Sequence, residues 1–158
     1  MSADDDHLLP PHPAALHRRL VEALYLDAML LADEARDYGE HHARGDAAAL
    51  PPGHSVAFSC ESLRLTTRLM HLLAWLLGQR AVAAGELTGS EPSCRMPMVA
   101  DTEAGVRSQL PARARALIET SEALYRRAMV LDAALIAALP PVSPARALQQ
   151  RLAIDLRG

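Results

Sequence analysis

Aromatic side chains are scarce in this sequence, and their scarcity limits how a core can be built. One Trp, three Tyr and one Phe make up 3% of the 158 residues, whereas hydrophobic residues of all kinds reach 50%. The chain is long enough for one domain with a substantial core. That core must be mostly Leu and Ala, which are strong helix formers. Because β-branched runs and period-two alternation are lacking as well, the sequence predicts an all-α fold.

Lysine is absent, and all 16 basic residues are arginine. We interpret this as the mark of a GC-rich genome rather than a special use of the guanidinium group. The formal net charge is −3, and no basic face emerges along the chain. Since nucleic-acid binding depends on a concentrated positive surface, the sequence argues against nucleic acid as the main partner.

Signals for export or membrane insertion are also lacking. The N-terminal stretch MSADDDHLLPPHP is acidic and broken by proline, unlike a signal peptide. The longest uncharged run in the most apolar region extends from Leu69 to Gln79, far short of the ~20 residues that a bilayer requires. Cys60 and Cys94 form no C-x-x-C pair and indicate reduced thiols. We therefore expect a cytoplasmic protein that does not bind membranes.

Catalytic motifs are missing too. Neither H-E-x-x-H, nor E-x-x-H, nor a glycine-rich phosphate loop, nor G-x-S-x-G occurs. Cys60 lies among apolar neighbours without a matched histidine, which predicts a buried, inert thiol. His41 and His42 beside Glu40 and Asp46 are a possible metal site, but adjacent loop histidines are more often solvated. We expect no catalytic residues, no metal and no cofactor.

Three long apolar-periodic segments define the organisation of the chain. We expect helices over residues 13–38, 55–87 and 109–139, joined by polar or proline-containing connections. They form an antiparallel three-helix bundle with a long central helix, spanning residues 13–139. Residues 1–12 are predicted to be a disordered arm. Residues 140–158 are predicted to be a tail that is either flexible or a short helix beginning at Ser143-Pro144.

The first and third helices each carry an apolar seam with alternating spacings of three and four residues, which is typical of helix-on-helix packing. In the first helix the seam is Val21, Leu24, Ala28, Leu31, Ala35 and Tyr38. In the third it is Leu110, Ala114, Leu117, Ser121, Leu124, Ala128, Leu131 and Leu135.

The middle helix is too apolar for an ordinary surface helix, which buries an arc of a little over ~100°. Its polar side chains fall in one narrow stripe, formed by Glu61, Arg64, Arg68, His71, Gln79 and Glu86. The ridge expected at a dimer or core contact is Leu65, Leu69, Leu72 and Leu76. Part of the apolar arc would stay exposed in a lone bundle, so we predict a homodimer with this helix near the twofold axis. The alternative is that the other helices and the tail cover it within one protomer.

Trp75 falls inside the polar stripe and admits two interpretations. It is either a binding anchor, since Trp and Arg dominate interface hot spots, or a structural residue stacked on an arginine or covered by a loop. We predict that the stripe is exposed and binds a partner through Arg64, Arg68, His71 and Gln79, with Trp75. The tail also has two interpretations: it docks in a partner's groove, or it packs back on the bundle.

The run ESLRLTTRLMHLLAWLLGQRAVAAGE, residues 61–86, resembles the signature of the alphaproteobacterial "regulator of CtrA degradation" family. The matching positions in this run are Glu61, Ser62, Arg64, Leu65, Thr66, Thr67, Arg68, Leu69, Met70, Trp75, Leu76, Leu77, Gln79, Arg80, Ala81, Val82 and Glu86. Further matching positions are Glu34, Ala35 and Tyr38 in the first helix, and Ser121, Leu124, Tyr125, Leu131 and Asp132 in the third.

The resemblance implies a non-enzymatic adaptor for regulated proteolysis in the cell cycle. Members of the family are dimers of three-helix bundles that join a ClpXP protease primed by a response-regulator-like adaptor. They deliver protein substrates and recruit a further cyclic-di-GMP-binding adaptor for CtrA. The implied location is the cytoplasm, at the cell pole.

Two other functions remain open on the sequence. A helical enzyme or metal-binding bundle would contain bound metal when purified. A signalling or transcriptional scaffold unrelated to proteolysis would capture partners but no protease.

Overall fold

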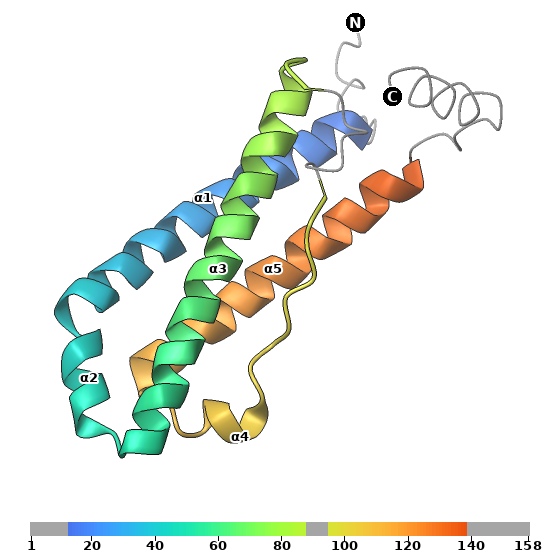
Figure 1. The fold of residues 1–158 in the computed structure, drawn as a ribbon. Coiled ribbons are helices and arrows are strands. Elements are labelled where there is room, and N and C mark those ends of the chain that lie inside the picture. The colour runs from blue at the N-terminus through green and yellow to red at the C-terminus, as the bar shows by residue number, and fades with distance from the viewer. Residues whose placement is uncertain (1–12, 88–94, 139–158) are drawn as a thin grey trace, which may run out of the picture.

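The computed structural model describes residues 13–87 and 95–138, and these residues form an all-α bundle without strands. Within these described residues, five helices follow one another (Figure 1): α1 (Pro13–His41), α2 (Ala43–Ala49), α3 (Pro52–Ala83), α4 (Ala104–Arg107) and α5 (Ala112–Ala138). The three long helices α1, α3 and α5 all pack against one another. The all-α bundle expected from the sequence is confirmed. The predicted arm over 1–12 and the whole of the predicted tail over 140–158 lie outside the described residues.

The predicted helix ends differ from the observed ends in ways that local chemistry explains. The first helix was predicted to end at residue 38, but α1 continues through Gly39 to His41. Helix α3 begins at Pro52, where a missing amide hydrogen costs nothing, and ends at Ala83 rather than Leu87. Its last carbonyls accept bonds from the amides of Gly85 and Glu86, and Gly85 has a φ of 78°. This is a Schellman cap, in which glycine occupies the left-handed position.

The connection predicted as a polar loop over residues 39–53 is partly helical, so that prediction is wrong for α2. Its alanines are strong helix formers, and Ala43, Ala47 and Leu50 pack against the core. The Tyr38 hydroxyl donates a 2.7 Å hydrogen bond to the Asp46 carboxylate, which ties α2 to the end of α1. Burial first, and this hydrogen bond second, raise the pKa of Tyr38 above its ordinary value.

The core follows the two apolar seams predicted from spacing. Every predicted seam residue of α1 is buried except Ala35, which is partly buried. The seam of the third helix is buried from Leu110, which lies just before α5, to Ala128. Leu131 and Leu135 are partly buried. The ridge of α3 also lies in this core: Leu65, Leu69, Leu72 and Leu76 are all less than 9% exposed. These four leucines therefore pack within the protomer.

Helix α1 runs antiparallel to α3, as predicted. Glu22 near the start of α1 forms a 3.0 Å ion pair with Arg80 near the end of α3. Tyr38 near the end of α1 contacts the ring of Phe58 near the start of α3.

Helix α5 runs parallel to α3, which corrects the antiparallel arrangement expected for the third helix. Arg68 of α3 contacts Ser121 of α5, and Trp75, further along α3, contacts Asp132, further along α5. The reason is the long connection between the two helices, which returns the chain to the end of the bundle where α3 begins. Figure 1 shows residues 95–103 descending alongside α3 and α5 toward α4. We call this extended segment the strap.

Candidate functional site

The polar stripe of α3 faces inward, which corrects the prediction that it is an exposed surface. Arg68 is 1% exposed, Trp75 2% and Gln79 8%. No periodic pattern in the chain indicates that α5 and the strap both lie over this stripe. Because these three side chains are enclosed, they cannot meet a partner unless the strap or a helix moves. Trp75 is therefore a structural residue in this fold rather than an exposed binding anchor.

Two other predicted members of the stripe, Arg64 and His71, are less enclosed, whereas Glu61 is 4% exposed. Arg64 remains 41% exposed and donates a 2.8 Å hydrogen bond to Glu61, its neighbour one turn earlier. His71 is half-buried, and its Nδ1 atom is buried without a hydrogen-bond partner in the described part of the chain. Gln79 hydrogen-bonds His17 of α1; burial lowers the pKa of His17, and this bond opposes that shift.

Arg68 joins α3 to both α5 and the strap. One terminal nitrogen donates to the Ser121 hydroxyl at 2.9 Å, and the other donates to the Ala100 carbonyl of the strap at 3.1 Å. The second nitrogen also lies 3.7 Å from a carboxylate oxygen of Glu122. Burial lowers the pKa of Arg68, and the nearby carboxylates of Glu122, Asp101 and Glu61 oppose this shift. Its charge is thus buried and paired.

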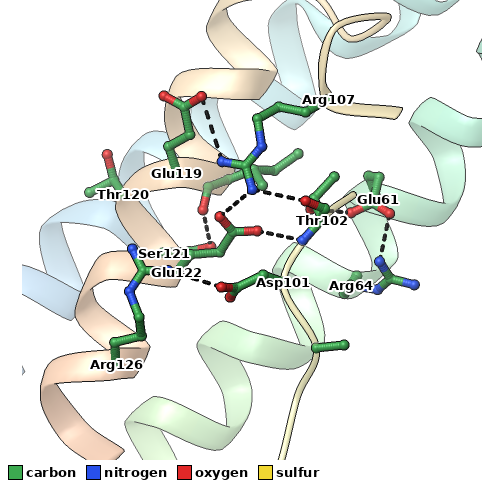
Figure 2. A network of polar contacts seen from close by, with 12 residues as sticks. Glu61, Arg64, Asp101, Thr102, Arg107, Glu119, Thr120, Ser121, Glu122 and Arg126 are labelled. Atoms are coloured by element: carbon green, nitrogen blue, oxygen red, sulfur yellow. Dashed lines mark hydrogen bonds and ion pairs between the residues drawn. The ribbon is translucent and has the colours of Figure 1, made fainter. Parts of the chain in front are cut away.

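Glu122 is the acidic centre of the network and is 1% exposed (Figure 2). One of its oxygens accepts a 2.7 Å bond from the Thr102 amide, and the other accepts a 2.8 Å bond from Arg107 of α4. Burial raises the pKa of Glu122, but the hydrogen bonds from Thr102 and Arg107 and the charge of Arg107 outweigh it. The net pKa lies below the ordinary value, so the carboxylate stays ionised.

Thr102 fixes one end of the strap, and all three of its polar groups form hydrogen bonds. Its amide donates to Glu122, its hydroxyl donates to Glu61 at 2.6 Å, and its carbonyl accepts from Arg107 at 3.0 Å. The residue is 4% exposed. Thr102 therefore links α3, α4 and α5 at one point, as Figure 2 shows.

Asp132 fixes the other end of the strap. One carboxylate oxygen accepts a 3.0 Å bond from the indole nitrogen of Trp75, and the other accepts a 3.2 Å bond from the Met96 amide. Between the two ends, the Tyr125 hydroxyl donates a 2.7 Å bond to the Pro97 carbonyl. Burial raises the pKa of Tyr125, and the charge of Arg68 opposes the shift. The hydroxyl therefore remains a donor at neutral pH.

Four side chains central to this network were not singled out as site residues from the sequence: Thr102, Glu122, Tyr125 and Asp132. In the sequence Glu122 fits an ordinary surface charge pattern, because Glu119, Glu122 and Arg126 follow helical spacing. One signal was available, because Ser121, Glu122, Tyr125 and Asp132 follow helical spacing along a face next to the apolar seam. The strap residues carry no such periodicity, since an extended segment has no helical face.

The network is suited to holding chain segments together rather than to catalysis. Its carboxylates are already occupied by donors, and no nucleophile lies beside a free base among the residues in the network. Over residues 13–87 and 95–138, no three His, Cys, Asp or Glu side chains are grouped so that they could hold a metal ion. Cys60 is exposed, which corrects the prediction of a buried thiol.

A second feature is an uncharged face of α3 that points away from the bundle, which we call the outer face. Its large side chains recur every seven residues: Val56 (65% exposed), Leu63 (70%), Met70 (66%) and Leu77 (51%). Small side chains lie between them, namely Cys60, Thr67, Ala74 and Ala81. This spacing of large and small residues is that of a helix prepared to pack against another helix. None of the described helices has a stretch long and apolar enough to cross a bilayer.

Comparisons with known proteins agree with this architecture. Residues 13–155 match the family model described as "Protein of unknown function (DUF1465)". The crystal structure of RcdA from Caulobacter crescentus CB15 is similar at a TM-score of 0.59 and 34% sequence identity, over 72% of this chain and 88% of that chain. No protein of curated function matches the chain at a significant level.

Proposed function

This chain belongs to the RcdA-like DUF1465 family, and on that premise we propose that it is a non-enzymatic adaptor in regulated proteolysis. In this role it links a primed ClpXP protease to protein substrates and to further adaptors in cell-cycle control. The observation that carries the proposal is the 34% identity to RcdA over 88% of that chain.

The geometry supports a binding role over a catalytic one. The most highly connected polar residues serve to hold the strap against α3 and α5, and their donors and acceptors are paired with one another. The outer face of α3 is an exposed apolar surface, which is typical of contacts between proteins. A protein with these properties brings other proteins together without changing them chemically.

We further propose that the chain is a homodimer joined through the outer face of α3. This face remains uncovered by α1 and α5, although the leucine ridge on the opposite side of the helix is buried. From Val56 to Ala81 the face extends ~38 Å at 1.5 Å per residue. A large-small alternation over that length lets two copies of α3 approach closely around a twofold axis.

Arg64 is the member of the predicted partner-binding stripe that a protein partner can reach directly. It lies at the edge of the outer face and forms a partly exposed pair with Glu61. We propose that Arg64 and neighbouring exposed residues contribute to partner binding, while Arg68, Trp75 and Gln79 support the surface from within. The cell pole remains the location that the family resemblance implies.

Affinity capture of the tagged full chain from native extract tests the adaptor function. The matched sample lacks residues 140–158, which include the predicted tail. Recovery of ClpX together with a receiver-domain protein is the expected result. Loss of substrates alone from the shortened chain would assign the tail to substrate binding. Absence of the protease from both samples would contradict the proposal and leave a signalling scaffold as the better explanation.

A further inference from the structure

The strap is held by an arrangement that resembles the recognition of an extended peptide. Five hydrogen bonds join helical side chains to its main chain. Asp132 and Glu122 accept from the amides of residues 96 and 102, and Tyr125, Arg68 and Arg107 donate to the carbonyls of residues 97, 100 and 102. Hydrogen bonds to main-chain groups do not depend on which side chains the bound segment carries.

Only two strap side chains are buried, Met96 at 7% and Thr102 at 4% exposure. Six of the nine strap residues are exposed, and Met98 is 87% exposed. The strap therefore adds little apolar burial of its own. Segments with few buried apolar contacts open locally at lower free energy than the core does.

The side chains that hold the strap are more deeply buried than most of the strap itself. Arg68 and Glu122 are each 1% exposed, Tyr125 is 4% exposed and Asp132 is 7% exposed. All four are on the two long parallel helices. Their positions are set by core packing and by hydrogen bonds between the two helices, such as Arg68 to Ser121 and Trp75 to Asp132. Such a surface is organised in advance for an extended chain.

We propose that this surface, formed by Glu61, Arg68, Glu122, Tyr125 and Asp132, is a binding site for an extended segment of a partner protein. The strap occupies it in the free protomer and is displaced when the partner binds. The fitting segment has an apolar residue at the position of Met96 and a serine or threonine six residues later, because the Thr102 hydroxyl meets Glu61. This inference locates the partner binding proposed above. The role of the partner rests on that proposed function.

The test uses a fluorescein-labelled peptide, RMPMVADTE, which reproduces residues 95–103. The full chain is compared with its double variant M96G/T102G, which removes both buried strap side chains and leaves the helical surface intact. A tethered segment competes at an effective concentration of about millimolar. Fluorescence anisotropy is therefore expected to show at least tenfold tighter peptide binding by the double variant. Circular dichroism establishes that the variant keeps its helical content.

Peptides methylated on single backbone nitrogens identify the contacts. Methylation at the position of Met96 or Thr102 removes a donor to Asp132 or Glu122 and should weaken binding more than tenfold. Methylation at Met98 is the matched control, because that amide has no hydrogen-bond partner in the described part of the chain. Equal affinity of all three peptides would overturn the inference, as would no saturable binding by the folded variant.

If the double variant does not fold, hydrogen exchange of the wild-type chain tests the inference instead. Millimolar unlabelled peptide should accelerate exchange of the amides of Met96 and Thr102 by displacing the strap. Unchanged exchange at both amides would overturn the inference. Neither measurement uses a protease, so the peptide site and the adaptor function can fail separately.

Discussion

At the scale of single residues, burial of charge has the largest consequences in this protein. Arg68 and Glu122 are each 1% exposed, on two helices that meet in the middle of the bundle. Burying one charge without a partner is costly, whereas a buried pair with all its hydrogen bonds made is tolerated. The contribution of each charge to stability therefore depends on the other charge and on the strap. The strap supplies a carbonyl to Arg68 and an amide to Glu122.

Replacement of Arg68 by methionine should destabilise the fold by about 3 kcal/mol, because Glu122 then loses one of its two cationic neighbours in a buried site. The same change at Arg36, whose ion pair with Asp33 is exposed, should cost less than about 1 kcal/mol. Urea unfolding followed by the fluorescence of Trp75, the single tryptophan, measures both. Equal losses for the two variants would contradict the assignment of Arg68 as a buried link.

The depressed pKa of Glu122 predicts a particular dependence of stability on pH. Its pKa in the folded protein lies below the ordinary value of 4.5, so the fold favours the ionised form. The resulting stabilisation is present above about pH 4.5 and is lost as the pH falls through the lower folded value. Glu122→Gln should be less stable than the wild type at pH 7, and its stability should fall less between pH 5 and pH 3. Urea unfolding at several pH values provides the comparison, and parallel pH profiles would show that other groups govern acid unfolding.

At the scale of elements, the strap decides the topology. A short turn after α3 would place the third helix antiparallel to it. The connection instead runs back along the bundle before α5 begins, which makes α3 and α5 parallel (Figure 1). The contacts at the two ends of the strap, at Met96 and Thr102, fix this return path against both helices. Parallel neighbours in a helical bundle require such a crossover.

Two glycines test the description of the helix ends. Gly85 has a φ of 78° in the Schellman cap of α3, so Gly85→Ala should destabilise the fold by about 1 kcal/mol. Gly39 lies inside α1 with no positive φ, and a methyl group added there meets no atom within 4 Å. Gly39→Ala should therefore stabilise by about 0.5–1 kcal/mol. Thermal unfolding of both variants gives the signs, and the same sign for both would refute the assignment of Gly85 as the cap.

At the scale of the whole molecule, the outer face of α3 predicts association. Multi-angle light scattering on the wild-type chain at micromolar concentration should give twice the chain mass of 17.0 kDa. Met70→Glu places a charge at the centre of the outer face and should shift the protein to a monomer. Leu26→Glu is the matched control, because Leu26 is 62% exposed on α1, outside this face. A wild-type monomer at that concentration would exclude the dimer.

The three long helices and their core could be predicted from the amino-acid sequence. The two seams with three-four spacing, the leucine ridge of α3 and the excess apolar arc opposite it all follow from the 3.6-residue period, which is a local property of the chain. Burial of Val21, Leu24, Ala28, Leu31 and Tyr38 could be predicted for this reason. The family signature over residues 61–86 could also be identified without coordinates.

The direction in which the polar stripe of α3 faces depends on the packing of the whole bundle. A stripe containing Arg68 and Glu61 has the same spacing whether water or another helix lies over it. The outcome depends on contacts between residues far apart in sequence, such as Arg68 with Ser121 and Thr102 with Glu61. Those contacts arise from the parallel placement of α5 and the path of the strap, and neither has a periodic signal. Burial of paired charges is a property of the assembled bundle, since each charge is tolerated there only when the others are in place.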